Sequence, residues 1–149
     1  MRTGIKVSDA RTKRPIIASP DETVKACALM MVRDNVGSLL ILQGEKILGF
    51  VTERDIIKKI VARDLDPKTT KITKVMTKEV ISIEPNRDIY DAILLMNAEE
   101  VRRLPVLSQG RIVGLITIKD IVKINPAMLE LFMHRIHVRE ESKKVNGGY

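Results

Sequence analysis

The chain has 149 residues, of which 44% are hydrophobic and 30% are charged, and its 26 basic and 19 acidic residues give a net charge of +7. Such a length supports one good hydrophobic core but hardly two independent ones. No apolar run approaches the roughly 20 residues of a membrane span, and the N-terminus lacks the apolar core of a signal peptide. The single cysteine, Cys27, excludes an internal disulfide and favours a cytoplasmic location.

The first half of the chain predicts a strand, a helix, two strands joined by a tight turn, and a second helix. Asp21 follows Pro20, and we expect it to cap the first of these helices. The expected elements are a lead-in segment at 5–13, an extended segment at 16–18, a helix from Val24, strands at 38–42 and 46–51, and a helix from Thr52.

After a linker at 66–70, the second half predicts the same order of elements, with Asn86 as the expected cap of its first helix. An extra amphipathic helix and a disordered tail follow. The expected elements are a lead-in segment at 70–78, an extended segment at 80–83, a helix from Ile89, strands at 103–107 and 111–116, and a helix from Thr117.

The two halves are copies of one another at a constant offset of 65 residues. From Pro20 to Lys58 the chain is identical to the stretch 65 residues later at 12 of 39 positions, where chance would give roughly two or three. Both copies end in Gly-x-x-Thr-x-x-Asp, at residues 49–55 and 114–120. We therefore expect two α/β (α+β) repeats, each β-α-β-β-α, that pack with pseudo-twofold symmetry around a shared cleft.

Thr-x-x-Asp at the start of a helix has two interpretations. As a capping box, it satisfies backbone N–H groups and serves structure alone, which is by far the commoner role of a single copy. Its duplication, the preceding glycine, and a helix N-terminus directed into the cleft favour a nucleoside-phosphate site. In that interpretation, the aspartate accepts hydrogen bonds from the two hydroxyl groups of a ribose.

The repeats and their motifs resemble a tandem pair of CBS domains, also called a Bateman module. The second copy is the better match, with Met76-Thr77 before the strand, Arg103-Leu104-Pro105-Val106, and Gly114 to Asp120. The resemblance covers about residues 8–125. We therefore place the first repeat at 8–66, the second at 72–125, an extra C-terminal helix at 126–142 and a disordered tail at 143–149.

The resemblance implies a regulatory, non-catalytic module that binds an adenine nucleotide (AMP, ADP or ATP) and signals to an unidentified partner protein. S-adenosylmethionine is an alternative ligand in the family. Threonine and aspartate of each motif would contact phosphate and ribose, the extended segments would flank the adenine, and basic residues near the second motif would contact phosphate. The implied ligand-binding residues are Ile17, Thr52, Asp55, Ile81, Ser82, Ile83, Arg102, Arg103, Pro105, Thr117 and Asp120.

The two copies differ beside the motif, because Arg102 and Arg103 align with Gly37 and Ser38. Two adjacent arginines near a helix N-terminus form an anion pocket, whereas their alternative role is a solvated strand end. The first copy also has a leucine where the second has Pro105. The second copy is therefore the better candidate for a nucleotide site.

The remaining features exclude several functions or leave alternatives open. Only four aromatic residues accompany the positive charge, which disfavours nucleic-acid binding, and the abundance of Lys, Glu, Arg and Ile suits a thermophile. His134 and His137 have no further metal ligands near them in sequence, and no catalytic triad is available, so we expect neither a metal nor an enzyme.

We also expect a homodimer through apolar helix faces, with a scaffold that binds no nucleotide as the alternative function. The apolar residues expected in that interface are Ile56, Ile60, Ile121 and Ile124.

Overall fold

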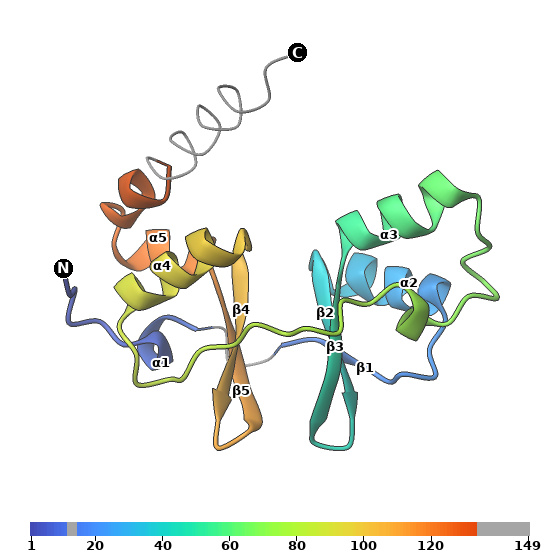
Figure 1. The fold of residues 1–149 in the computed structure, drawn as a ribbon, viewed down its shortest axis with the longest axis horizontal. Coiled ribbons are helices and arrows are strands. Elements are labelled where there is room, and N and C mark those ends of the chain that lie inside the picture. Colours follow the sequence, from blue (N-terminus) through green and yellow to red (C-terminus); the bar gives the residue numbers. More distant parts are fainter. Residues whose placement is uncertain (12–14, 134–149) are drawn as a thin grey trace, which may run out of the picture. The chain divides into compact units, whose positions relative to one another are not determined.

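The structure, a computed structural model, describes residues 1–11 and 15–133 (Figure 1). Contacts divide these residues into two compact units. Unit 1 contains residues 1–11, 81–108 and 113–133, and unit 2 contains residues 15–80 and 109–112. No helix in the described part of the chain is long and apolar enough to cross a membrane.

Unit 2 holds a three-stranded sheet in the order β1-β2-β3, in which β1 is parallel to β2 and β2 is antiparallel to β3. Gly44 and Glu45 form the turn between β2 and β3, and Gly44 has a positive φ of 62°. The elements of this unit are β1 (Ile17–Ala18), α2 (Val24–Asp34), β2 (Ser38–Gln43), β3 (Lys46–Thr52), α3 (Glu53–Lys59), and the short 3-10 helices η1 (Val61–Arg63) and η2 (Ile72–Lys74).

Unit 1 repeats this order with a smaller regular sheet. β4 and β5 pair with each other, and the segment before α4 joins β4 only through a parallel bridge between Ile83 and Val106. A further helical segment at 128–133 buries Met128 and Phe132 in the same core as α4 and α5. The elements are α1 (Val7–Ala10), α4 (Ile89–Glu99), β4 (Arg103–Ser108), β5 (Arg111–Thr117) and α5 (Ile118–Ile124).

The expected helices and strands up to α5 are confirmed except at 80–83, where only the bridge of Ile83 forms. The capping residue expected for the first helix of each repeat was wrong in both repeats. Thr23 caps α2 by accepting a hydrogen bond from Ala26 N, and Asp88 caps α4 by accepting one from Tyr90 N. Asp21 instead lies in a turn, where its N–H donates to Ser19 Oγ. The chain thus makes one more turn after each proline before the helix begins, so Asp21 and Asn86 lie too early.

Each lead-in segment packs into the core of the other repeat. The N-terminal segment with α1 belongs to unit 1, where Val7 N donates to Arg87 O at 2.8 Å and Ile89 N donates to Ile5 O at 3.0 Å. Val7 is fully buried there, in one cluster with Ile89 and Ile121. The sequence shows that each repeat has a lead-in segment, but it does not show this exchange.

The lead-in segment of the second repeat makes the matching contacts in unit 2. Ile72 N donates to Glu22 O, and Phe50 and Thr77 exchange two backbone hydrogen bonds of 3.0 and 2.8 Å. Gly49 permits this approach, because a Cβ there would lie 2.8 Å from Met76 Cγ and 2.9 Å from Thr77 O. In the first repeat, the glycine of the motif therefore makes room for the exchanged segment.

Two of the four isoleucines expected on uncovered helix faces are buried, and a third is partly buried. Ile60 and Ile121 are buried in the cores of their own units, and Ile56 packs against the core of unit 2. Of the four, only Ile124 is exposed. Besides Ile17 in β1, the exposed large apolar side chains of unit 2 lie on α2, on α3 and in the segment after α3: Leu29, Val32, Ile57, Val61 and Leu65.

Candidate functional site

Both Thr-x-x-Asp motifs form complete capping boxes at the starts of α3 and α5. At α5, the Thr117 hydroxyl accepts from Asp120 N at 3.2 Å and donates to Asp120 Oδ2 at 3.0 Å, and Thr117 N donates to the same oxygen at 2.9 Å. Thr52 and Asp55 make the same three bonds at 2.9 to 3.2 Å. The structural role of the motif is thus present in both repeats.

The arginine pair lies next to the motif of the second repeat. Ile118 N, in the first turn of α5, donates to Arg102 O at 3.0 Å, which brings the backbone of Arg102 to the start of this helix. Glu53 N donates in the same way to Gly37 O at 3.1 Å in the first repeat. The backbone arrangement is therefore shared, whereas the two guanidinium groups belong to unit 1 alone.

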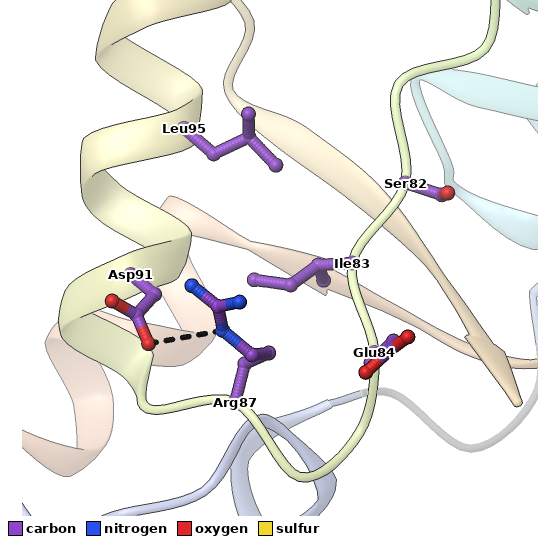
Figure 2. Close-up of a pocket in the computed structure, with 6 residues that line it drawn as sticks. All are labelled: Ser82, Ile83, Glu84, Arg87, Asp91 and Leu95. Atoms are coloured by element: carbon purple, nitrogen blue, oxygen red, sulfur yellow. Dashed lines mark hydrogen bonds and ion pairs between the residues drawn. The ribbon is translucent and has the colours of Figure 1, made fainter.

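The remaining predicted site residues differ in their exposure. Ile17 is 43% exposed, and Ser82 is half-buried. Ile83 and Pro105 are buried and hydrogen-bonded to each other through Ile83 N and Pro105 O, and Ile81 packs against the same core. Figure 2 shows that Ser82 and Ile83 point in opposite directions, with Ile83 directed toward α4. Of these two residues, Ser82 is therefore the one whose side chain is directed away from α4.

The carboxylate of the first motif has a cationic partner that the sequence analysis missed. Lys59 Nζ lies 3.3 Å from Asp55 Oδ1 and donates to Val75 O at 2.8 Å. The equivalent of Lys59 in the second repeat is Ile124, so this ion pair cannot form there. The i,i+4 spacing of Asp55 and Lys59 was the available signal.

Asp88 is a second residue whose role the sequence analysis missed. Besides capping α4, its carboxylate accepts hydrogen bonds from Thr3 N, Thr3 Oγ1 and Gly4 N at 2.7 to 3.0 Å. Burial alone would raise the pKa of Asp88, but these hydrogen bonds and that from Tyr90 N outweigh burial, and the pKa is lowered. Asp88 thus fixes the exchanged N-terminal segment to unit 1.

The described part of the chain contains no candidate metal centre, and its one cysteine is buried. No group of three or more His, Cys, Asp or Glu side chains that could hold a metal occurs there. Burial, reinforced by the negative charge of Glu22, raises the pKa of the Cys27 thiol to about 11, so this thiol stays protonated at neutral pH. His134 and His137, most of the predicted C-terminal helix and the predicted tail lie outside the described residues.

Comparison with known proteins shows to which family the chain belongs. The family model described as "CBS domain" matches the chain twice, at residues 7–62 and 72–126. The chain belongs to the CBS domain family. Together the two matches span most of its length, which identifies a tandem CBS pair.

Its relatives include other small CBS domain proteins. The CBS domain-containing protein YhcV of Bacillus subtilis is 32% identical over 115 residues, which cover 77% of this chain and 81% of YhcV. The crystal structure of the CBS domain protein NE2398 has a TM-score of 0.74 and 32% identity and covers 80% of this chain and 95% of that chain.

A third similar structure has adenosine-containing ligands. The CBS domain pair of protein MJ0100, in complex with 5-methylthioadenosine and S-adenosyl-L-methionine, has a TM-score of 0.75 and 25% identity. The match covers 83% of this chain and 98% of that chain. Both ligands were found bound to MJ0100.

Proposed function

We propose that this CBS pair is a regulatory, non-catalytic module that binds an adenine nucleotide at the motif of its second repeat and signals to a partner protein. The observation that carries the proposal is the position of Arg102 beside the first turn of α5, where Thr117 and Asp120 form their capping box. A carboxylate for a ribose and guanidinium groups for a phosphate thereby belong to one small region of unit 1.

The differences between the repeats support the second motif over the first. Asp55 is paired with Lys59, and the positions next to its motif are Gly37 and Ser38, which offer no positive charge to a phosphate. We therefore propose one stronger and one weaker site.

The choice among adenosine compounds rests on the same residues. AMP, ADP and ATP carry phosphates that suit Arg102 and Arg103, whereas S-adenosylmethionine carries none. The complex of MJ0100 nevertheless favours S-adenosylmethionine or methylthioadenosine as a second candidate class. A positively charged sulfonium near the arginine pair would be repelled, which is why we rank the nucleotides first.

We also propose that the protein forms a homodimer through unit 2. Val32 on α2 and Val61 on η1 are 79% and 68% exposed, and Leu29 on α2 and Ile57 on α3 are exposed as well. Large apolar side chains gathered in one unit are typical of protein–protein contacts. The alternative is a scaffold that assembles through this face without any nucleotide.

A thermal-shift screen of the full chain with AMP, ADP, ATP, S-adenosylmethionine and a short RNA tests the proposal. A nucleotide at 100 times its dissociation constant should add about 2.7 kcal/mol to the free energy of unfolding. Stabilisation by RNA alone would instead indicate that the positive charge of the protein serves to bind nucleic acid. If none of the adenosine compounds shifts the transition, the scaffold function replaces the proposed one.

A further inference from the structure

We propose that unit 1 has a second small-molecule site, beside α4, that takes an α-amino acid with an aliphatic side chain. A pocket of about 360 Å³ lies there, within the range of roughly 300–1,000 Å³ that small-molecule sites occupy. Its lining contains neither the Thr-x-x-Asp motif nor the arginine pair, and it shares only Ser82 and Ile83 with the residues expected at the nucleotide site, so the proposal adds a second ligand class to unit 1. The lining residues, shown in Figure 2, are Ser82, Ile83, Glu84, Arg87, Asp91 and Leu95.

The backbone at the edge of the pocket can hold both ends of an amino acid. Ile83 uses its N–H and C=O toward β4, through Pro105 O and Leu107 N, both at 3.0 Å. Because backbone groups alternate in direction along an extended segment, Ser82 O and Glu84 N point to the edge of this segment that faces away from β4. Neither has a backbone partner among the described residues. Together they present one acceptor for an ammonium group and one donor for a carboxylate.

The charged side chains of the pocket can also bind the ammonium group and the carboxylate of an amino acid. Arg87 Nε pairs with Asp91 Oδ2 at 3.2 Å, so its two terminal nitrogens are available to the pocket, and Figure 2 shows the guanidinium between Asp91 and Ile83. A ligand carboxylate can bind these nitrogens, and a ligand ammonium group can bind near Asp91 and Glu84. The lining charge of two carboxylates and one guanidinium disfavours a phosphate and suits a zwitterion.

The apolar part of the pocket selects the side chain of the ligand. Ile83 and Leu95 come from the two sides of the pocket, the extended segment and α4, and Ile83 points toward α4 (Figure 2). Placing an aliphatic side chain against them removes apolar surface from water, which is the main favourable term for a ligand without phosphates or rings. Leucine, isoleucine and valine are the ligands that fit this chemistry.

The first repeat lacks this chemistry at the equivalent positions. Glu22, Ala26 and Met30 align with Arg87, Asp91 and Leu95. A glutamate in place of the arginine repels a carboxylate, and the alanine removes the partner of an ammonium group. The amino-acid site is therefore specific to unit 1.

Calorimetric titration of the full chain with L-leucine tests the site, with L-leucinamide and N-acetyl-L-leucine as probes that lack the carboxylate and the ammonium charge. We expect saturable binding of leucine, with both analogues at least roughly tenfold weaker. Arg87→Gln should weaken leucine binding roughly 10- to 150-fold, as expected for a lost charged hydrogen bond. The matched control Glu22→Gln, at the equivalent position of the first repeat, should bind leucine like the wild type.

Three results would overturn the inference: no heat with leucine, isoleucine or valine at millimolar concentration, unchanged leucine affinity in folded Arg87→Gln, or equal affinity for N-acetyl-leucine. The last result would assign the pocket to the C-terminal carboxylate of a peptide. Titration of AMP into Arg87→Gln separates this site from the proposed nucleotide site, because AMP affinity should not change. Leucine binding without any nucleotide binding would refute the proposed function and leave this inference standing.

Discussion

The first helix of each repeat presents the same sequence position in two opposite environments. Val32 on α2 is 79% exposed, whereas its equivalent on α4, Asn97, is 2% exposed, and neither of its side-chain amide atoms has a hydrogen-bond partner among the described residues. Unit 1 contains the additional helical segment at 128–133, and the residues that align with this segment in the first repeat form the end of η1 and the linker. The two repeats thus differ in the segments that follow their last helices, whereas both keep the Thr-x-x-Asp motif.

The largest expected effect concerns the exposed helix face of unit 2. Val32→Asp and Val61→Asp place a charge where the proposed dimer excludes water, and we expect each variant to be monomeric at tens of micromolar by light scattering. Lys123→Glu on α5 of unit 1 is the control and should stay dimeric. A wild-type chain that is already monomeric at this concentration rules out the dimer.

Asp120→Ala and Asp55→Ala compare the two motifs directly. Loss of a charged hydrogen bond to ribose should weaken AMP binding roughly 10- to 150-fold in Asp120→Ala, with a much smaller effect in Asp55→Ala. Both variants lose the same capping box, which should cost about 0.5–2 kcal/mol of stability. Calorimetric titration of folded protein measures the affinities, and wild-type affinity in both variants would assign both aspartates to capping alone.

Gly49→Ala tests the contact between the first motif and the exchanged lead-in segment. The new methyl group would meet Met76 and the backbone oxygen of Thr77, so we expect a loss of about 1–3 kcal/mol in urea unfolding. Met76→Ala added to Gly49→Ala should recover only part of the loss, because the clash with the backbone of Thr77 remains. Wild-type stability of Gly49→Ala would mean that the segment moves away without cost.

The smallest effect is the pH dependence that Asp88 gives to unit 1, since Thr23 at the equivalent position of unit 2 does not titrate. The folded state lowers the pKa of Asp88 below its ordinary value of 3.8, so its stabilisation is present above that value and is lost as the pH falls through the lowered one. Asp88→Asn should flatten the decline of the melting temperature in this acidic range. An unchanged decline would show that other carboxylates cause it.

The sequence predicted the elements well because the repeat, the hydrophobic periods and the Thr-x-x-Asp caps are local signals. It failed where distant segments decide the structure. The caps at Thr23 and Asp88 depend on a turn after each proline, and Ile60 and Ile121 are buried through contacts that the helical period alone does not specify. The candidate site follows the same pattern, because the arginine pair was visible by alignment, whereas Lys59 and the pocket at Arg87 required the folded chain.

The exchanged lead-in segments also fix an order of events during synthesis. Unit 2 has its whole core once the chain has grown past Val75 and Thr77, but the N-terminal segment has to wait for Ile89 and Ile121. The lead-in segment of the first repeat therefore leaves the ribosome before both units but is among the last parts to find its place, across a separation of about 80 residues that slows folding. Until then, Val7 and its neighbours form an unpaired apolar segment, and a break at the linker would leave each half with the lead-in segment that its counterpart needs.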